Sequence, residues 1–212
     1  NDFLHGALVA TMKRGANVSL TREIPGLSGV VLGVSWNAGA ETALTDNLTF
    51  GAILTDKNNR ALSDEHFVFF NQLSSPDLSV KQLDEALGGD QEQIEIDLNG
   101  VPANVDRIVV VLYVNDGPAQ RRTLGQLRSC VVRVLNLADN AELVRSEELA
   151  TALRDETAIA LGEAYRHDGG WKFKVLGQAY STGLAGVAAD HGWRGGAPGA
   201  GGPGLTATAP RD

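Results

Sequence analysis

The chain has 212 residues, of which 43% are hydrophobic and 21% charged. A chain of this size can bury about 70% of its unfolded surface, which excludes a mostly disordered protein. Its 26 acidic and 18 basic residues give a formal charge of −8, which argues against binding nucleic acid through a basic face. A single cysteine, Cys130, cannot form an internal disulfide or a cysteine-rich zinc site. Together with the lack of a membrane-length apolar run, this predicts a soluble, cytoplasmic protein.

The composition of the chain changes once, after Trp193. Residues 195–212 contain six of the 25 glycines and three of the seven prolines, and such a segment buries too little apolar surface to offset its ordering entropy. We therefore expect a disordered tail, and we expect truncation after Gly192 to leave the melting temperature almost unchanged. Before this tail we find no linker and no repeat of fixed period, which predicts one domain.

Short β-branched or aromatic runs bounded by turn residues are typical of strands, and the domain contains a series of them. In chain order, the predicted strands are 30–34, 48–54, 67–70, 93–98, 108–114 and 131–135. The run at 93–98 alternates strictly, so Ile94, Ile96 and Leu98 should share a buried face while two carboxylates face solvent.

A β-hairpin is predicted near the C-terminal end of the domain. Asp168 and Gly169 lie between two alternating segments, which is a strong short-range hairpin signal. The second of these segments should turn Trp171, Phe173 and Val175 inward.

Helical spacing of apolar residues is limited to two segments, 121–129 and 183–190. The predicted fold class is therefore mainly β, a two-sheet antiparallel β-sandwich with one or two short helices.

The sequence gives no support for catalysis. It contains no G-x-S-x-G elbow, no P-loop and no G-x-G-x-x-G after a strand. Cys130 adjoins a predicted buried strand, where a thiol stays protonated and unreactive. We expect no enzymatic activity, and we identify no small-molecule substrate.

A series of short motifs runs through most of the chain. They are KRGANVSL at 13–20, SDEHFVFFN at 63–71, SPD at 75–77, ETA at 156–158, GE at 162–163, YRH at 165–167, WKF at 171–173, GQ at 177–178 and GLAG at 183–186. In this order they resemble the TerD family of bacterial tellurium-resistance and general stress proteins. The resemblance covers roughly residues 13–192, so we assign 1–12 as an N-terminal extension, 13–194 as the domain and 195–212 as the tail. It implies a two-sheet sandwich without known catalysis, and calcium binding as in well-studied members.

The resemblance is weakest at the family's calcium loop, which follows a tryptophan and carries alternating aspartates. Counted from Trp36, the matching positions hold Thr42, Thr45, Asn47 and Thr49. Calcium takes six to eight oxygen ligands and favours carboxylates, so four lost aspartates imply weak or partial binding. A second acidic stretch, residues 84–97, keeps six carboxylates and no base. The candidate calcium ligands are Asp90, Glu92, Asp64, Asp116, Asn47 and Asn71.

Two functional hypotheses follow from the resemblance. In the first, calcium orders the acidic loops of a stress-response protein and creates a surface for a protein partner or a membrane-associated stress complex. In the second, a metal-independent interaction module has replaced the cation by internal contacts of Asn and Thr. Arg121, Arg122 and Arg128 are the candidate partner-binding residues, and the protein would be cytoplasmic or peripheral at the inner membrane surface. Solvated acidic loops and solvated arginines are the alternatives to both sites.

Overall fold

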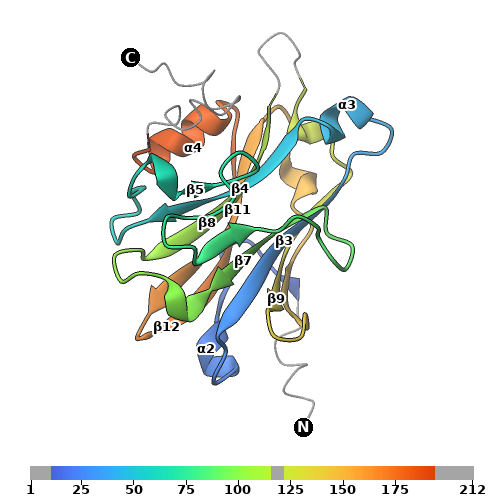
Figure 1. The fold of residues 1–212 in the computed structure, drawn as a ribbon. Coiled ribbons are helices and arrows are strands. Elements are labelled where there is room, and N and C mark those ends of the chain that lie inside the picture. The colour runs from blue at the N-terminus through green and yellow to red at the C-terminus, as the bar shows by residue number, and fades with distance from the viewer. Residues whose placement is uncertain (1–10, 116–121, 194–212) are drawn as a thin grey trace.

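The computed structural model describes residues 11–115 and 122–193. The first half of the chain contains β1 (Thr11–Met12), β2 (Asn17–Ser19), α2 (Leu20–Glu23), β3 (Gly29–Asn37), α3 (Thr42–Thr45), β4 (Leu48–Thr55), β5 (Phe67–Val68), β6 (Val80–Gln82) and β7 (Glu92–Asp97). The second half contains β8 (Arg107–Val114), β9 (Ser129–Asn136), β10 (Glu142–Ser146), β11 (Ala158–His167), β12 (Gly170–Tyr180) and α4 (Leu184–Asp190) (Figure 1). Short 3₁₀ turns, η1 (Asp64–His66), η2 (Leu98–Gly100), η3 (Leu124–Gln126) and η4 (Ala150–Ala152), connect several strands.

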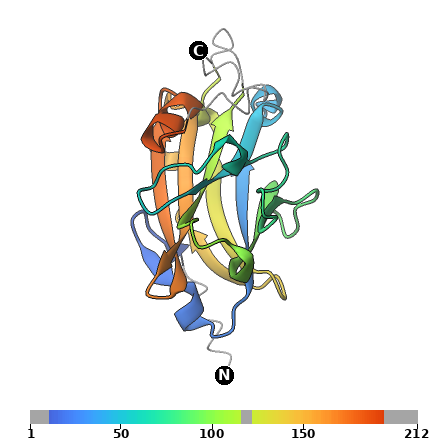
Figure 2. The same ribbon diagram turned by 60° about the vertical axis from the view of Figure 1, so that its left-hand side comes forward.

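The strands form two sheets that face each other (Figures 1 and 2). The first sheet has the order β1-β10-β9-β3-β7-β6, and the second has the order β2-β12-β11-β8-β4-β5. Neighbouring strands are antiparallel except at one edge, where β1 pairs with β10 in parallel. The outermost strands have two or three residues each. The predicted β-sandwich is therefore confirmed, with one parallel pair added at its edge.

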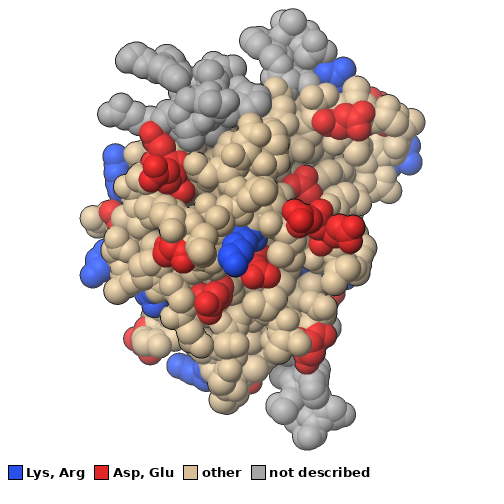
Figure 3. All heavy atoms as spheres, viewed as in Figure 1, with Lys and Arg blue, Asp and Glu red and all other residues tan. Residues whose placement is uncertain are grey.

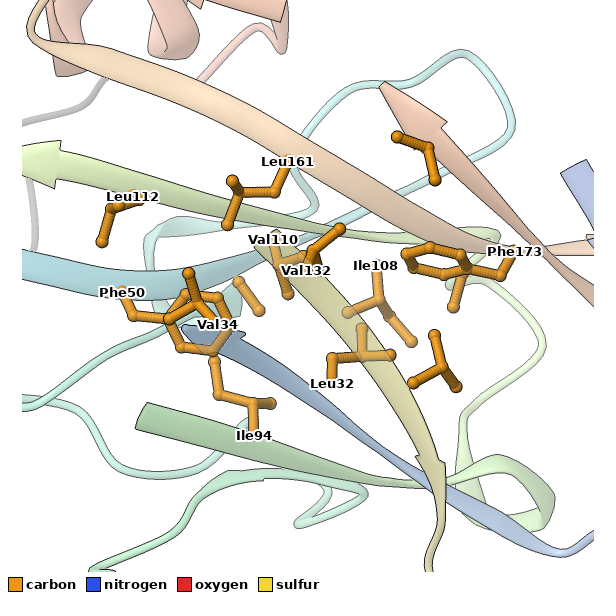
Figure 4. Close-up of a cluster of buried hydrophobic side chains, with 14 of the residues drawn as sticks. Leu32, Val34, Phe50, Ile94, Ile108, Val110, Leu112, Val132, Leu161 and Phe173 are labelled. Atoms are coloured by element: carbon orange, nitrogen blue, oxygen red, sulfur yellow. The ribbon is translucent and has the colours of Figure 1, made fainter. Parts of the chain in front are cut away.

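The main core lies between the two sheets (Figure 4). Leu32 and Val34 of β3 meet Phe50 of β4 and Val110 of β8, and all four are fully buried. Each fully buried side chain of this kind contributes about 1.5–3 kcal/mol, so this layer is the main source of the fold's stability.

A second apolar cluster covers the outer face of the second sheet. Alternate residues of β8, Val109 and Val111, point to this face and are covered by α4 and by Trp193. Strand β8 is thus buried on both faces, which explains its unbroken apolar run. Trp193 is 5% exposed, and its ring centroid lies 4.5 Å from that of Phe67. The expectation that a cut after Gly192 is harmless was therefore wrong, because the cut removes a buried indole.

The predicted hairpin is present as β11 and β12. Asp168 and Gly169 have φ values of 50° and 80°, the left-handed pair that a tight hairpin turn requires. Trp171, Phe173 and Val175 are buried in the main core, as predicted. The alternation predicted for residues 93–98 is confirmed as well, because the side chains of 94, 96 and 98 are all buried.

The predicted helix at 121–129 was wrong. In the described part of this segment, the chain forms the 3₁₀ turn η3 and then enters β9 at Ser129. Leu124 and Leu127 are both buried. Their three-residue spacing suggested a helix, but a single 3₁₀ turn is enough to place both side chains on the same face. The predicted strand at 67–70 is also shorter, because a turn from Phe69 to Gln72 ends β5 at Val68.

The one-turn helices α2 and α3 were not predicted, whereas α4 lies within the predicted segment 183–190. Residues 1–10, 116–121 and 194–212, which include the tail, lie outside the described residues. Among the described helices, none has the length and apolarity to cross a membrane.

Candidate functional site

One end of the sandwich brings together the start of β4 and the end of β8. Leu48 pairs with Val114, and the Asn115 N–H donates to the Asn47 carbonyl at 2.7 Å. The Asn115 side-chain amide donates to Thr49 Oγ1 at 2.6 Å, while the Asn47 amide donates to the Ala43 carbonyl of α3 at 2.8 Å. Two positions of the substituted loop, 47 and 49, are therefore held by hydrogen bonds within the protein.

Glu92 lies close to this end, at the first position of β7. It is on the same strand face as Ile94, so its carboxylate points between the sheets. Gln82 Nε2 donates to Glu92 Oε1 at 2.7 Å. Burial raises the pKa of Glu92 to about 7, although hydrogen bonds from Gln82 and from the Phe50 backbone oppose this rise. A carboxyl of this kind is partly protonated near neutral pH, unless a cation is beside it.

Asp90 lies on the opposite face of the same sheet. Its two carboxylate oxygens accept from Arg133 Nε and Nη2, both at 2.9 Å, and Oδ2 also accepts from Gln93 Nε2 at 2.8 Å. The Asp90 side chain is fully buried. A Cβ at Gly33 would lie 2.1 Å from Asp90 Oδ2, so the missing side chain of Gly33 gives the carboxylate its place.

Arg133 connects Asp90 to the neighbouring strand and loop. Its Nη1 donates to Glu142 Oε1 at 2.7 Å and its Nη2 donates to the Gly88 carbonyl at 3.2 Å. The pKa of the Arg133 guanidinium is raised, mainly by its hydrogen bonds to Asp90. Burial opposes this rise, and Glu142 adds to it. This pair was not predicted from the sequence, although a single charge within the apolar run 131–135 indicates that Arg133 needs a partner.

The remaining predicted calcium ligands are dispersed. Asp64 begins the 3₁₀ turn η1, where its carbonyl accepts from Gln72, and Asn71 is exposed in the turn after β5. Asp116 lies outside the described residues. Within 11–115 and 122–193, no three His, Cys, Asp or Glu side chains are grouped closely enough to hold a metal ion. The described candidates are thus not assembled into one site.

The comparisons with known proteins agree with this fold. The sequence matches the TerD domain over residues 8–191. The chain belongs to the TerD family. It is 37% identical over 186 residues to the tellurium resistance protein TerD of Serratia marcescens, covering 86% of this chain and 96% of that protein.

A second TerD-family relative is general stress protein 16U of Bacillus subtilis (strain 168). It is 37% identical over 190 residues, which cover 87% of this chain and 98% of the relative. The crystal structure of a homologue of telluride resistance protein TerD from Streptomyces coelicolor A3(2) has a TM-score of 0.58 at 18% identity. It covers 77% of this chain and 96% of that one, and shows that the two share a fold. The predicted family is confirmed.

The loop that follows Trp36 contains the one-turn helix α3. Thr42 and Thr45 lie at the ends of the one-turn helix α3 and are exposed. The exposed Asp46 caps this helix. Short polar side chains at these positions can bond to the backbone and to each other without a cation.

The three predicted partner-binding arginines are not equally described. Arg121 lies outside the described residues. Arg122 is half-buried, and Arg128 is exposed beside Gly39, where a Cβ would lie 2.6 Å from Arg128 Nε. Arg122 and Arg128 do not share an α-helical face, since the described residues 122–129 form a 3₁₀ turn and the start of β9.

A second ion pair that was not predicted from the sequence lies on the outer face of the second sheet, with Glu163 buried and Arg107 partly exposed. Arg107 Nη1 is 2.6 Å from Glu163 Oε2, and the guanidinium lies 5.0 Å from the Tyr165 ring centroid. Cys130 is buried in β9, as predicted. Burial, and then the charge of Glu148, raise the pKa of its thiol to about 12.

Proposed function

We propose that this TerD-family chain is a non-enzymatic stress-response protein that acts by binding other proteins, and that it needs no calcium to hold its fold. The observation that carries the proposal is the Asp90 carboxylate, whose two oxygens are both bonded to Arg133. A guanidinium at this position supplies the positive charge that an acidic loop otherwise takes from a cation. The names of the relatives, tellurium resistance and general stress proteins, support the stress role.

Calcium binding is the second candidate function, in a weak form. Asn115 Oδ1 is buried and accepts no hydrogen bond from the residues that the structure describes. The amide nitrogen of the same side chain is bonded to Thr49 Oγ1. One carboxylate, Glu92, acts on the same region: burial raises the pKa of Tyr113, the strand partner of Thr49, and the charge of Glu92 adds to this rise. With so few acids, calcium should bind no more tightly than about 10⁻⁴ M, the weak end for calcium modules.

Calorimetric titration of the chelator-stripped protein with calcium separates the two candidates. We expect no heat, or a dissociation constant weaker than about 10⁻⁴ M, and the same melting temperature with and without chelator. Submicromolar affinity would overturn the metal-independent function. The double substitution Asn47→Asp, Thr49→Asp should strengthen calcium binding and destabilise the metal-free protein, because like charges repel.

The binding role is tested in cells. We expect chemical crosslinking of the stressed bacterium, with the chain as bait, to recover the same proteins with chelator as with calcium. The proteins recovered should lie in the cytoplasm or at the inner membrane surface. Recovery that requires calcium would contradict the proposal.

A further inference from the structure

We propose that a groove beside edge strand β6 binds a peptide segment of a partner protein in which a lysine or arginine lies between apolar residues. This inference rests on the proposed function, whose protein partner it describes in chemical terms.

The groove has a volume of about 310 Å³, and half of its lining residues are apolar, namely Phe70, Leu73, Leu83 and Ala86. Phe70 and Leu73 are 46% and 52% exposed. Leu87, in the same β6–β7 connection as Ala86, is 55% exposed. Large apolar side chains that cluster at the surface around a hollow mark an interaction site, whereas scattered ones do not.

A carboxylate and one unpaired acceptor give the groove a polar end. Glu92 and Gln82 both line it, and the bond between them uses the Gln82 amide nitrogen as donor. Gln82 Oε1 is buried and accepts no hydrogen bond from any described residue. Leaving such an acceptor unpaired is unfavourable, and a donor that enters the groove would remove this penalty. Gln91 also lines the groove, but its Oε1 already accepts a hydrogen bond from the Trp36 N–H at 2.7 Å.

The charge around the groove selects a cationic donor. Asp84 lines the groove, and the exposed Glu85 follows it in the chain. Figure 3 shows the face that carries β6 and β7, where acidic side chains surround a basic one. Lys81 is the basic residue of strand β6, and it pairs with Glu95 of β7. The groove itself is therefore acidic, which favours a positive ligand.

A lysine or arginine side chain combines the two properties that this groove requires. Its methylene stem packs on apolar walls while its head donates several hydrogen bonds. The head would bond to the Glu92 carboxylate and to Gln82 Oε1, and apolar neighbours in the peptide would cover Phe70 and Leu73. The volume of the groove is near the lower limit for small-molecule sites, so the groove suits one long side chain better than a cofactor.

A library of random dodecapeptides displayed on phage, selected on the full chain in chelator, tests this directly. We expect the enriched sequences to share one basic residue flanked by apolar residues. The best peptide, labelled and measured by fluorescence polarisation, should lose affinity about tenfold or more with Glu92→Gln and with Phe70→Ser. The matched control is Glu95→Gln, the same change on the same strand at an outward-facing position, which should bind as the unchanged chain does.

Three results would overturn the inference: no enriched family of peptides, an enriched family without a basic residue, or equal binding by the Glu92→Gln and Glu95→Gln variants. Concentration-dependent self-association in sedimentation experiments, abolished by Phe70→Ser, would also overturn it, since a second copy would then be the occupant. These failures leave the proposed function intact if calcium still binds weakly. Tight calcium binding that competes with the peptide would instead overturn the proposed function.

Discussion

Replacing Arg133 by methionine tests the buried ion pair that organises the outer face of the first sheet. The substitution leaves the Asp90 carboxylate, whose side chain is fully buried, without its cation. Breaking a buried pair in this way costs about 3–5 kcal/mol, which in urea lowers the unfolding midpoint by about 2 M for an m-value of about 2 kcal/mol/M. The matched control is Arg145→Met, because Arg145 bonds to the same Glu142 but is 44% exposed. It should cost less than about 1 kcal/mol.

Asp90→Asn extends this test to the metal question. In chelator it should destabilise the chain by about 1–3 kcal/mol, less than Arg133→Met does, because Arg133 keeps its bond to Glu142. A metal-free calcium site behaves in the opposite way, since loss of one repelling carboxylate stabilises the apo protein. An increase in stability with Asp90→Asn, or a cost of Arg133→Met no larger than that of the control, would refute the assigned role of the pair.

Three further predictions concern single side chains. Burial raises the pKa of Glu92 from 4.5 to about 7, so the contribution of Glu92 to stability is greatest below pH 4.5 and falls as the pH rises to 7. Glu92→Gln removes this pH dependence. In urea unfolding, the variant should be more stable than the unchanged chain by about 3 kcal/mol near pH 8 and by almost nothing near pH 4. Equal gains in stability at both pH values would contradict a buried charge at position 92. Gly33→Ala places a methyl group against Asp90 Oδ2, so it should lower the free energy of unfolding by several kcal/mol. In a chain that also carries Asp90→Ala, the same substitution should cost much less. If the two losses of stability simply add in the double variant, the two residues are not in contact. Trp193→Ala should cost about 3 kcal/mol in thermal or urea unfolding, and a loss below about 1 kcal/mol would show that this indole is not packed on Phe67.

The main strands could be predicted because their signals are local. Residues 30–34, 108–114 and 131–135 lie within β3, β8 and β9, since β-branched runs between turn residues suit a pleated, buried surface. The hairpin turn at Asp168 could also be predicted from the sequence, because its backbone conformation depends on the turn residues themselves.

The short edge strands and the polar site were not predictable in the same way. Strands β1 and β2 have two and three residues, too few for a periodic pattern, and they exist because a longer strand lies beside them. The Asp90–Arg133 pair joins residues 43 positions apart, so its existence depends on the register of β3 against β9, which places Gly33 opposite Arg133. Sequence proximity suggested instead that Asp90 and Glu92 act together, whereas the sheet separates them onto opposite faces.

The shortness of the outermost strands also limits how the protein can polymerise or recruit extended chains. Strands β5 and β6, at one border of each sheet, present two and three residues, so an incoming strand would find few free N–H and C=O groups to continue a ladder. Natural β-proteins avoid uncontrolled edge-to-edge assembly in this way. Recognition at these borders must consequently depend on side chains and not on backbone pairing, which makes it selective for the partner's amino-acid sequence.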